Sequence, residues 1–142
     1  MKLHNLITDE VIITKITNRV TDALLNELIE SLQGTAPDIQ IKYLALGTSN
    51  TPASNTDTQL GAEIFRTAVT AQTKTGVGEL ATDFTVLDVE AVGAIEEIGL
   101  FGGSTATAAA NSGVLLSRIL WHKVKTASEE ITFRRIDKIT RG

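Results

Sequence analysis

The sequence predicts a mainly β domain with one N-terminal α-helix, folded as an antiparallel β-sandwich or a barrel-like domain. Three observations lead to this fold class. The chain has 142 residues, the length of one ordinary domain. From residue 39 onward, short apolar segments alternate with turn residues. Only one earlier stretch has the apolar spacing of a helix. We expect an N-terminal arm or strand at residues 1–16 and a single β-rich domain at residues 17–142, with its leading helix at about 18–33.

Residues 1–16 carry more apolar side chains than a solvated tail would. The β-branched run at residues 11–13 favours a strand, although the apolar residues around it also permit a helix. Leaving this surface in water is costly, so we expect an assembly arm that is buried against a neighbouring subunit. The alternative, an edge strand of the chain's own sheet at residues 11–15, stays open.

The helix expected at residues 18–33 rests on an apolar stripe with helical spacing. Thr17 or Asn18 could cap its N-terminus, and Gly34 stands where a left-handed C-cap belongs. The stripe predicts one buried face, formed by Val20, Ala23, Leu24, Leu28 and Leu32, and widened by Leu25 and Ile29.

The first half of the β region contains three expected strands and one long loop. Apolar and polar residues alternate at 39–45, which predicts a strand with one buried face. Residues 47–61 are nearly all small and polar, as in a surface loop. A strand at 62–73 then reaches a Gly-Val-Gly turn at 76–78, and a further strand follows at 80–89.

The second half contains three more expected strands. They lie at 94–101, 113–124 and 130–136, and the small residues at 104–112 predict a flexible connection between the first two.

The strand at 94–101 has apolar residues on both of its faces. Alternation places Ile98 and Leu100 on one face and Glu97, Gly99 and Phe101 on the other. We therefore expect this strand to be covered on both sides.

No catalytic, cofactor-binding or metal-binding residue is predicted. The chain has no cysteine, and its two histidines, His4 and His122, lack metal-ligand spacing. The neighbours Glu96 and Glu97 would point to opposite faces of a strand, so they cannot form a carboxylate pair. The glycine-rich turns do not continue into a phosphate-binding motif. We expect a protein that is not an enzyme.

Charge and hydropathy argue against nucleic-acid and membrane partners. The net charge is −4, with a local basic excess only near the C-terminus at Arg134, Arg135, Lys138 and Arg141. No run approaches the ~18 consecutive apolar residues of a membrane span, and the first ten residues lack the layout of a secretion signal.

Five short motifs occur in a consistent order. They are LALGT at 44–48, TQLGAEIFR at 58–66, IEEIGLF at 95–101, LLSR at 115–118 and TASEEITF at 126–133. This order resembles the N-terminal domain of phage tail-fibre (tail-collar) proteins and small virion proteins that share it. The resemblance covers about two-thirds of the chain. Members that serve as fibres usually continue into a long shaft and a receptor-binding tip, whereas this chain stops at Gly142, so the resemblance implies an assembly domain and not a receptor-binding tip.

The resemblance implies a tailed-bacteriophage virion structural protein, assembled in the host cytoplasm. We expect a tail or baseplate assembly component, or a fibre-attachment component, that forms a homo-oligomer, for which a trimer is one candidate, and contacts other phage structural proteins. The alternative is a capsid decoration (cement) protein. A carbohydrate-binding module is less favoured because only Trp121 and Tyr43 could stack on a sugar, and a small hydrolase comes last.

The sequence also contains two pairs of oppositely charged residues. Glu63 and Arg66 are three residues apart, and Glu97 and Arg118 fall on two expected strands. Charges on a small domain are usually solvated and such pairs then contribute about 0–1 kcal/mol, so we expect solvated pairs. The sharper alternative is a polar network at a subunit contact.

Overall fold

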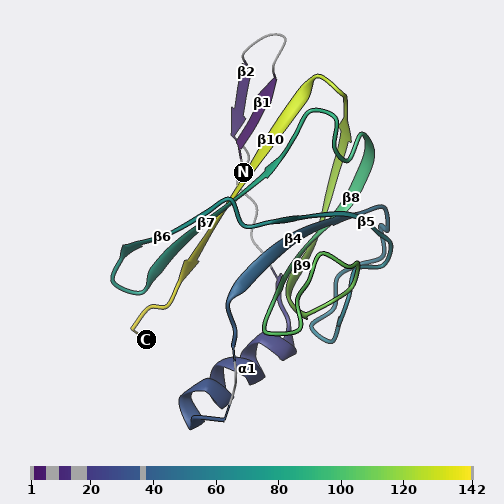
Figure 1. The fold of residues 1–142 in the computed structure, drawn as a ribbon. Helices are drawn as coiled ribbons and strands as arrows, with labels where there is room; N and C mark the ends of the chain where they lie inside the picture. Colours follow the sequence, from purple (N-terminus) through teal and green to yellow (C-terminus); the bar gives the residue numbers. More distant parts are fainter. Residues whose placement is uncertain (1, 6–9, 14–18, 36–37, 142) are drawn as a thin grey trace.

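The protein is an open sandwich of two antiparallel sheets with one helix, which confirms the expected fold class in its sandwich form (Figure 1). The computed structural model describes residues 2–5, 10–13, 19–35 and 38–141. The two sheets are not joined into a closed barrel, and the helix lies at one end of the sandwich.

Each sheet has five strands. The first sheet has the order β2 (Glu10–Ile13), β1 (Lys2–Asn5), β10 (Glu129–Lys138), β7 (Glu79–Val86) and β6 (Ala71–Gly76). The second has the order β3 (Arg19–Val20), β9 (Val114–Lys125), β8 (Gly93–Gly102), β4 (Ile41–Gly47) and β5 (Glu63–Ala68). Two strand pairs are long: β7 pairs with β10, and β8 pairs with β9. The alternation of apolar and polar residues along these strands fixes which residues lie opposite each other.

The helix α1 (Asp22–Gln33) begins later than the sequence predicted. Thr21 is its N-cap: its hydroxyl accepts a hydrogen bond from the Leu24 N–H and donates to the Leu115 carbonyl of β9. The expected helical residues Arg19 and Val20 instead pair with β9 as strand β3. The predicted caps Thr17 and Asn18 lie outside the described residues, but a helix that starts at Asp22 excludes both. Gly34 has φ 83° and is the predicted left-handed C-cap.

The prediction that α1 buries one face is wrong. None of its residues is fully buried. Leu24 and Leu28 are half-buried, whereas Leu25, Ile29 and Leu32 are 52%, 63% and 86% exposed. The apolar stripe of α1 is therefore wider than the area over which the helix packs against the sheets.

The strand expected at 62–73 is two strands in different sheets. β5 belongs to the second sheet and β6 to the first. Between them the Val69 N–H donates to the Lys42 carbonyl of β4, and the Thr70 N–H donates to the Asp83 carbonyl of β7. This link is where the chain crosses the sandwich. The strand expected at 80–89 ends earlier, at Val86, where a turn begins.

The described parts of residues 1–16 are two strands. β1 pairs with β10, with Lys2 opposite Thr132, and β2 pairs with β1, with Lys2 opposite Ile13. An edge strand of the chain's own sheet, the alternative left open by the sequence, is the arrangement described for residues 10–13. The remainder of the expected arm, at 6–9 and 14–16, lies outside the described residues.

The core has two parts, one on each face of the second sheet. The larger part fills the space between the sheets and consists of Leu44, Leu46, Phe84, Val86, Ile95, Ile98, Leu100, Leu116, Ile131 and Phe133. The smaller part lies on the outer face, where Ala45, Phe101 and Leu115 pack with Leu60 from the loop after β4. The central strand β8 is thus covered on both sides, as the sequence predicted.

Candidate functional site

The loop at residues 48–62 is anchored by a buried ion pair. Glu97 of β8 and Arg118 of β9 have side chains only 0% and 3% exposed, and the Arg118 Nε lies 2.8 Å from the Glu97 Oε2. The Glu97 carboxylate also accepts hydrogen bonds from the backbone N–H groups of Ser49, Gly61 and Ala62, at 3.3, 3.0 and 2.8 Å. One carboxylate therefore binds both ends of the loop.

Arg118 binds the middle of the same loop. Its Nη2 donates to the Thr51 carbonyl at 2.9 Å and its Nη1 to the Asp57 carboxylate at 3.0 Å. Burial alone lowers the pKa of the Arg118 guanidinium, but the carboxylates of Glu97 and Asp57 raise it above its ordinary value. Arg118 is a permanent cation.

Gly47 makes this anchoring possible. It ends β4 directly beside Glu97, and a Cβ at this position would overlap the Glu97 carboxylate. Only glycine leaves room for the carboxylate to reach the loop.

The loop at residues 103–113 has a second anchor of the same kind. Arg66 of β5 makes a two-fold contact with Glu63, with Nε–Oε1 2.6 Å and Nη2–Oε2 3.0 Å, and the two side chains are 4% and 2% exposed. The Arg66 Nη1 donates to the carbonyls of Thr107 and Ser112, and Glu63 accepts from the Asn111 N–H. The guanidinium also lies 4.4 Å from the centre of the Phe101 ring.

These contacts correct two expectations from the sequence. The pairs Glu63–Arg66 and Glu97–Arg118 are buried and not solvated. The stretch 104–112, expected to be a flexible connection, is instead held by hydrogen bonds from Arg66 and Ser112. The polar networks form within one chain, and their presence at a subunit contact stays a prediction.

The two networks are complete as they stand. Among the described residues, no buried side-chain nitrogen or oxygen lacks a hydrogen-bond partner. Their charges serve to fix the loops, and none of the buried polar atoms is left over for a ligand. The networks give the outer face of the second sheet a preorganised surface.

An apolar groove lies beside α1, whose first residue, Asp22, donates its backbone N–H to the Asn55 carbonyl of the anchored loop at residues 48–62. It encloses about 420 Å³ between α1 and the free ends of β6, β7 and β10. In Figure 1, α1 lies at the bottom of the molecule and the β6–β7 hairpin extends to its upper left. The groove walls are mostly aliphatic, with contributions from Val20, Leu24, Leu25, Leu28, Ile39, Ile41, Leu80, Leu116 and Ile139.

Arg135 lines this groove together with two other charged residues, Asp137 and Lys138. Its Nη1 donates to the Ser117 hydroxyl of β9, and its Nη2 lies 2.6 Å from the Asp137 carboxylate. From the sequence, Arg134 and Arg135 were expected to be alike, as members of the local basic excess near the C-terminus. Strand parity separates them, because Arg135 points into the sandwich whereas Arg134 forms an outer pair with Asp83.

The histidines and the remaining acids do not converge on one point. His122 is exposed and its Nδ1 lies 2.8 Å from Glu96; the side chain of His4 lies outside the described residues. Glu96 and Glu97 point to opposite faces, as expected. Within the described part of the chain, no three His, Asp or Glu side chains are grouped to hold a metal ion, and no helix is long and apolar enough to span a membrane. The absence of enzymatic activity, cofactor and metal stays a prediction.

Comparisons with protein-family models, with curated proteins and with solved structures find no match to this chain.

Proposed function

We propose that this chain is a non-enzymatic structural component of a bacteriophage particle, acting as a homo-oligomer in the tail or baseplate. Its role there is to attach a fibre or to adapt one neighbouring subunit to another. The partners are further copies of the chain and other phage structural proteins.

One observation carries the proposal: the residues behind the tail-fibre resemblance are those that fix the loops. The motifs contribute both ion pairs, Glu63–Arg66 and Glu97–Arg118. They also contribute the outer core residues Leu60, Phe101 and Leu115 and the close-contact residue Gly47. Four of the five motifs therefore meet in one physical device, and the fifth, at 126–133, supplies Ile131 and Phe133 to the core between the sheets.

This device suits assembly better than catalysis. The charges are consumed in holding the loops at 48–62 and 103–113 in one conformation. Preordered loops lose little conformational entropy when they meet a partner, which favours binding. A catalytic site would instead need groups left free to act on a substrate.

Labelling of purified phage particles tests the proposal. Gold-conjugated antibodies against the purified chain should mark the tail or baseplate in electron micrographs. The matched control is the same antibody after absorption with the purified chain, which should leave particles unmarked. Labels on the head would favour the capsid decoration alternative. Intact and disrupted particles without any label would contradict a virion role.

A further inference from the structure

We propose that the turn at residues 54–57 couples the polar loop on the outer face of the second sheet to helix α1. Displacement of this loop releases α1 from the sandwich and changes the width of the groove beside it. The coupling links two surfaces of one chain, and it goes beyond the assembly role proposed above.

Helix α1 is hydrogen-bonded to the rest of the domain through its first residues. The Thr21 N–H donates to the Leu116 carbonyl of β9 at 3.1 Å, and the Thr21 hydroxyl donates to the Leu115 carbonyl. The Asp22 N–H donates to the Asn55 carbonyl of the loop at 2.9 Å. The loop therefore supplies one of the anchors that set the position of the helix.

The apolar contacts of α1 are limited. Leu24 packs against the core between the sheets but is only half-buried, and so is Leu28, which lines the groove. Most helical stability in proteins comes from packing of an apolar face, and a helix of 12 residues is marginal without it. We therefore expect α1 to open at a lower free-energy cost than the sheets do.

The Asp57 carboxylate fixes the turn that holds α1. Its Oδ2 accepts from the Arg118 Nη1 at 3.0 Å and from the Ser54 N–H at 2.8 Å. The Asp57 N–H donates in turn to the Ser54 carbonyl at 3.2 Å, which closes a turn around Asn55. Because Arg118 also binds the buried Glu97, a chain of hydrogen bonds runs from the centre of the second sheet to the anchor of α1.

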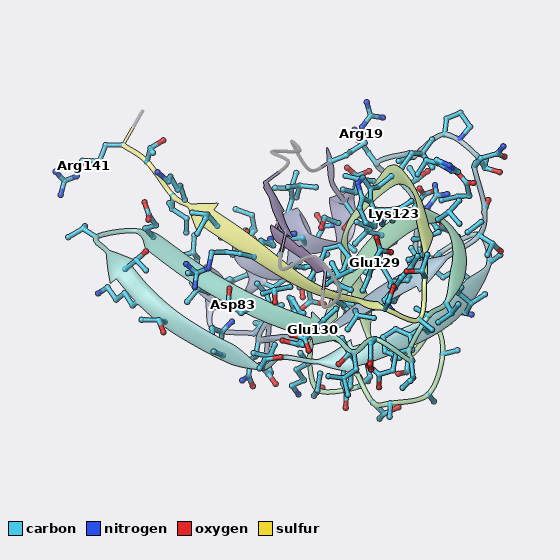
Figure 2. All side chains as sticks on the ribbon, turned by 90° about the horizontal axis from the view of Figure 1, so that it is seen from above. Arg19, Asp83, Lys123, Glu129, Glu130 and Arg141 are labelled. Carbon is cyan, nitrogen blue, oxygen red and sulfur yellow. The ribbon has the colours of Figure 1, made fainter. Side chains whose placement is uncertain are left out.

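Arg19 of β3 makes a second link between the loop and the start of α1. Its Nη1 donates to the Ala53 carbonyl at 3.0 Å, and its side chain is exposed. Figure 2 shows Arg19 at the margin of the molecule, well apart from Asp83 of the first sheet. A change at Asp83 is therefore a suitable control for changes in the loop.

The groove is sensitive to the position of α1 because the helix is one of its walls. Its lining includes Leu25 and Leu28 from α1, and Leu80 and Ile139 from β7 and the segment after β10. Since these walls belong to different elements, a movement of α1 about its anchored start alters the distance between them. The coupling is reciprocal, so a ligand that moves α1 also weakens its hold on the loop.

Hydrogen exchange followed by mass spectrometry tests the coupling on the full-length chain. In Asp57→Asn, the amides of α1 should exchange roughly tenfold faster or more, and the amides of β8 should be much less affected. Arg19→Met, which removes the second link, should act in the same direction. The matched control is Asp83→Asn, which makes the same chemical change in an arginine-paired aspartate of the first sheet; it should leave the exchange of α1 unchanged.

Thiol labelling gives a second measurement, because the natural chain has no cysteine. The thiol introduced by Leu24→Cys is partly covered while α1 is docked and becomes accessible to a maleimide when the helix opens. Addition of Asp57→Asn should raise its labelling rate roughly tenfold or more, and addition of Asp83→Asn should not. Val89→Cys marks an exposed side chain and should be labelled at the same rate in each background.

Faster exchange confined to α1, together with faster labelling at residue 24, would support the coupling. Unchanged exchange of α1 in both Asp57→Asn and Arg19→Met would overturn it, since the helix would then be held by its packing alone. An equal rise in exchange across α1 and β8 would also overturn it, because the loop contacts would then contribute only to global stability. If thermal melts show that Asp57→Asn does not fold, Arg19→Met decides between the same outcomes, because the Arg19 side chain is exposed.

Discussion

Glu97 shows how a single buried charge organises this domain. Its carboxylate is removed from water at the centre of the second sheet, and it accepts from one guanidinium and three backbone N–H groups. A buried carboxylate without partners would be very costly. Here the cost is offset by a complete set of donors, which come from a loop far away in the sequence. Glu97 thus links strand packing to loop geometry.

Removal of the Glu97 charge should destabilise the whole domain. We expect Glu97→Gln to lower the free energy of unfolding by about 3–5 kcal/mol, because it leaves the Arg118 cation buried without its main partner. The adjacent Glu96→Gln is the matched control: Glu96 pairs with exposed His122, so its replacement should cost less than ~1 kcal/mol. Urea titrations of both variants measure this. Similar losses in the two would show that the Glu97 network contributes little to stability.

Asp83 provides a pH-dependent contribution of known sign. The hydrogen bond from Arg134 holds the pKa of the Asp83 carboxyl below its ordinary value of 3.8. The folded state therefore binds this proton less readily than the unfolded state does, and the pair stabilises the fold above the ordinary pKa. The stabilisation is lost as the pH falls through the lowered pKa of the folded state.

Asp83→Asn should therefore destabilise the protein near neutral pH and not in strong acid. We expect a loss of up to ~1 kcal/mol at pH 7, since the Arg134 partner is largely exposed. Urea titrations of the unaltered chain and the variant at pH 7 and about pH 2 measure the difference. An equal loss of unfolding free energy in Asp83→Asn at pH 7 and at about pH 2 would contradict the role assigned to the Asp83 carboxylate.

Among the elements, the strands were the most predictable from sequence. Alternation of apolar and polar residues is a local signal, and it located β8, β9 and β10 to within a few residues. The start of α1 was not predictable in this way, because Thr21 is fixed by carbonyl groups of β9 that lie far along the chain. The break at Val69 likewise depends on a crossing between sheets.

The candidate site was predictable in its pairs but not in their burial. The sequence indicated both charged pairs, Glu63 with Arg66 and Glu97 with Arg118, and the structure contains both as ion pairs. Their burial depends on loops that fold back over them, and nothing in the local sequence of a small polar loop signals that. The groove depends on how the two sheets separate at one end, a property of the whole fold.

Leu100 and Leu32 give a matched test of the element assignments. Leu100 of β8 is 4% exposed in the core between the sheets, and Leu32 of α1 is 86% exposed. We expect Leu100→Ala to lower the free energy of unfolding by about 2–5 kcal/mol, and Leu32→Ala to change it by less than ~0.5 kcal/mol. Denaturant melts decide this. Equal effects would mean that β8 is not central to the core.

The N-terminal strands β2 and β1 form one edge of the first sheet. β1 pairs with residues Glu129 to Thr132 of β10, a segment that includes the fully buried Ile131. Deletion of residues 2–13 should expose this edge and lower the midpoint of the thermal transition, followed by circular dichroism. A truncated chain that melts normally but no longer enters particles would instead support an N-terminal assembly arm.

At the scale of the whole molecule, the outer face of the second sheet and the groove beside α1 differ in character. Polar loops fixed by buried ion pairs cover the outer face of the second sheet, whereas the region beside the exposed helix presents an apolar groove. In the described part of the chain, neither region contains three His, Asp or Glu side chains grouped to hold a metal ion. A rigid polar face and a separate apolar groove suit a protein that joins subunits together.

The central claim is that this chain is a built-in part of a phage particle. Quantitative mass spectrometry of density-gradient-purified particles tests it most directly, with a known major capsid protein as the internal reference for copy number. We predict that the chain co-sediments with infectious particles at a fixed number of copies per particle, and that this number survives a high-salt wash. A chain that remains in the soluble lysate, or whose amount per particle varies between preparations, would contradict the account.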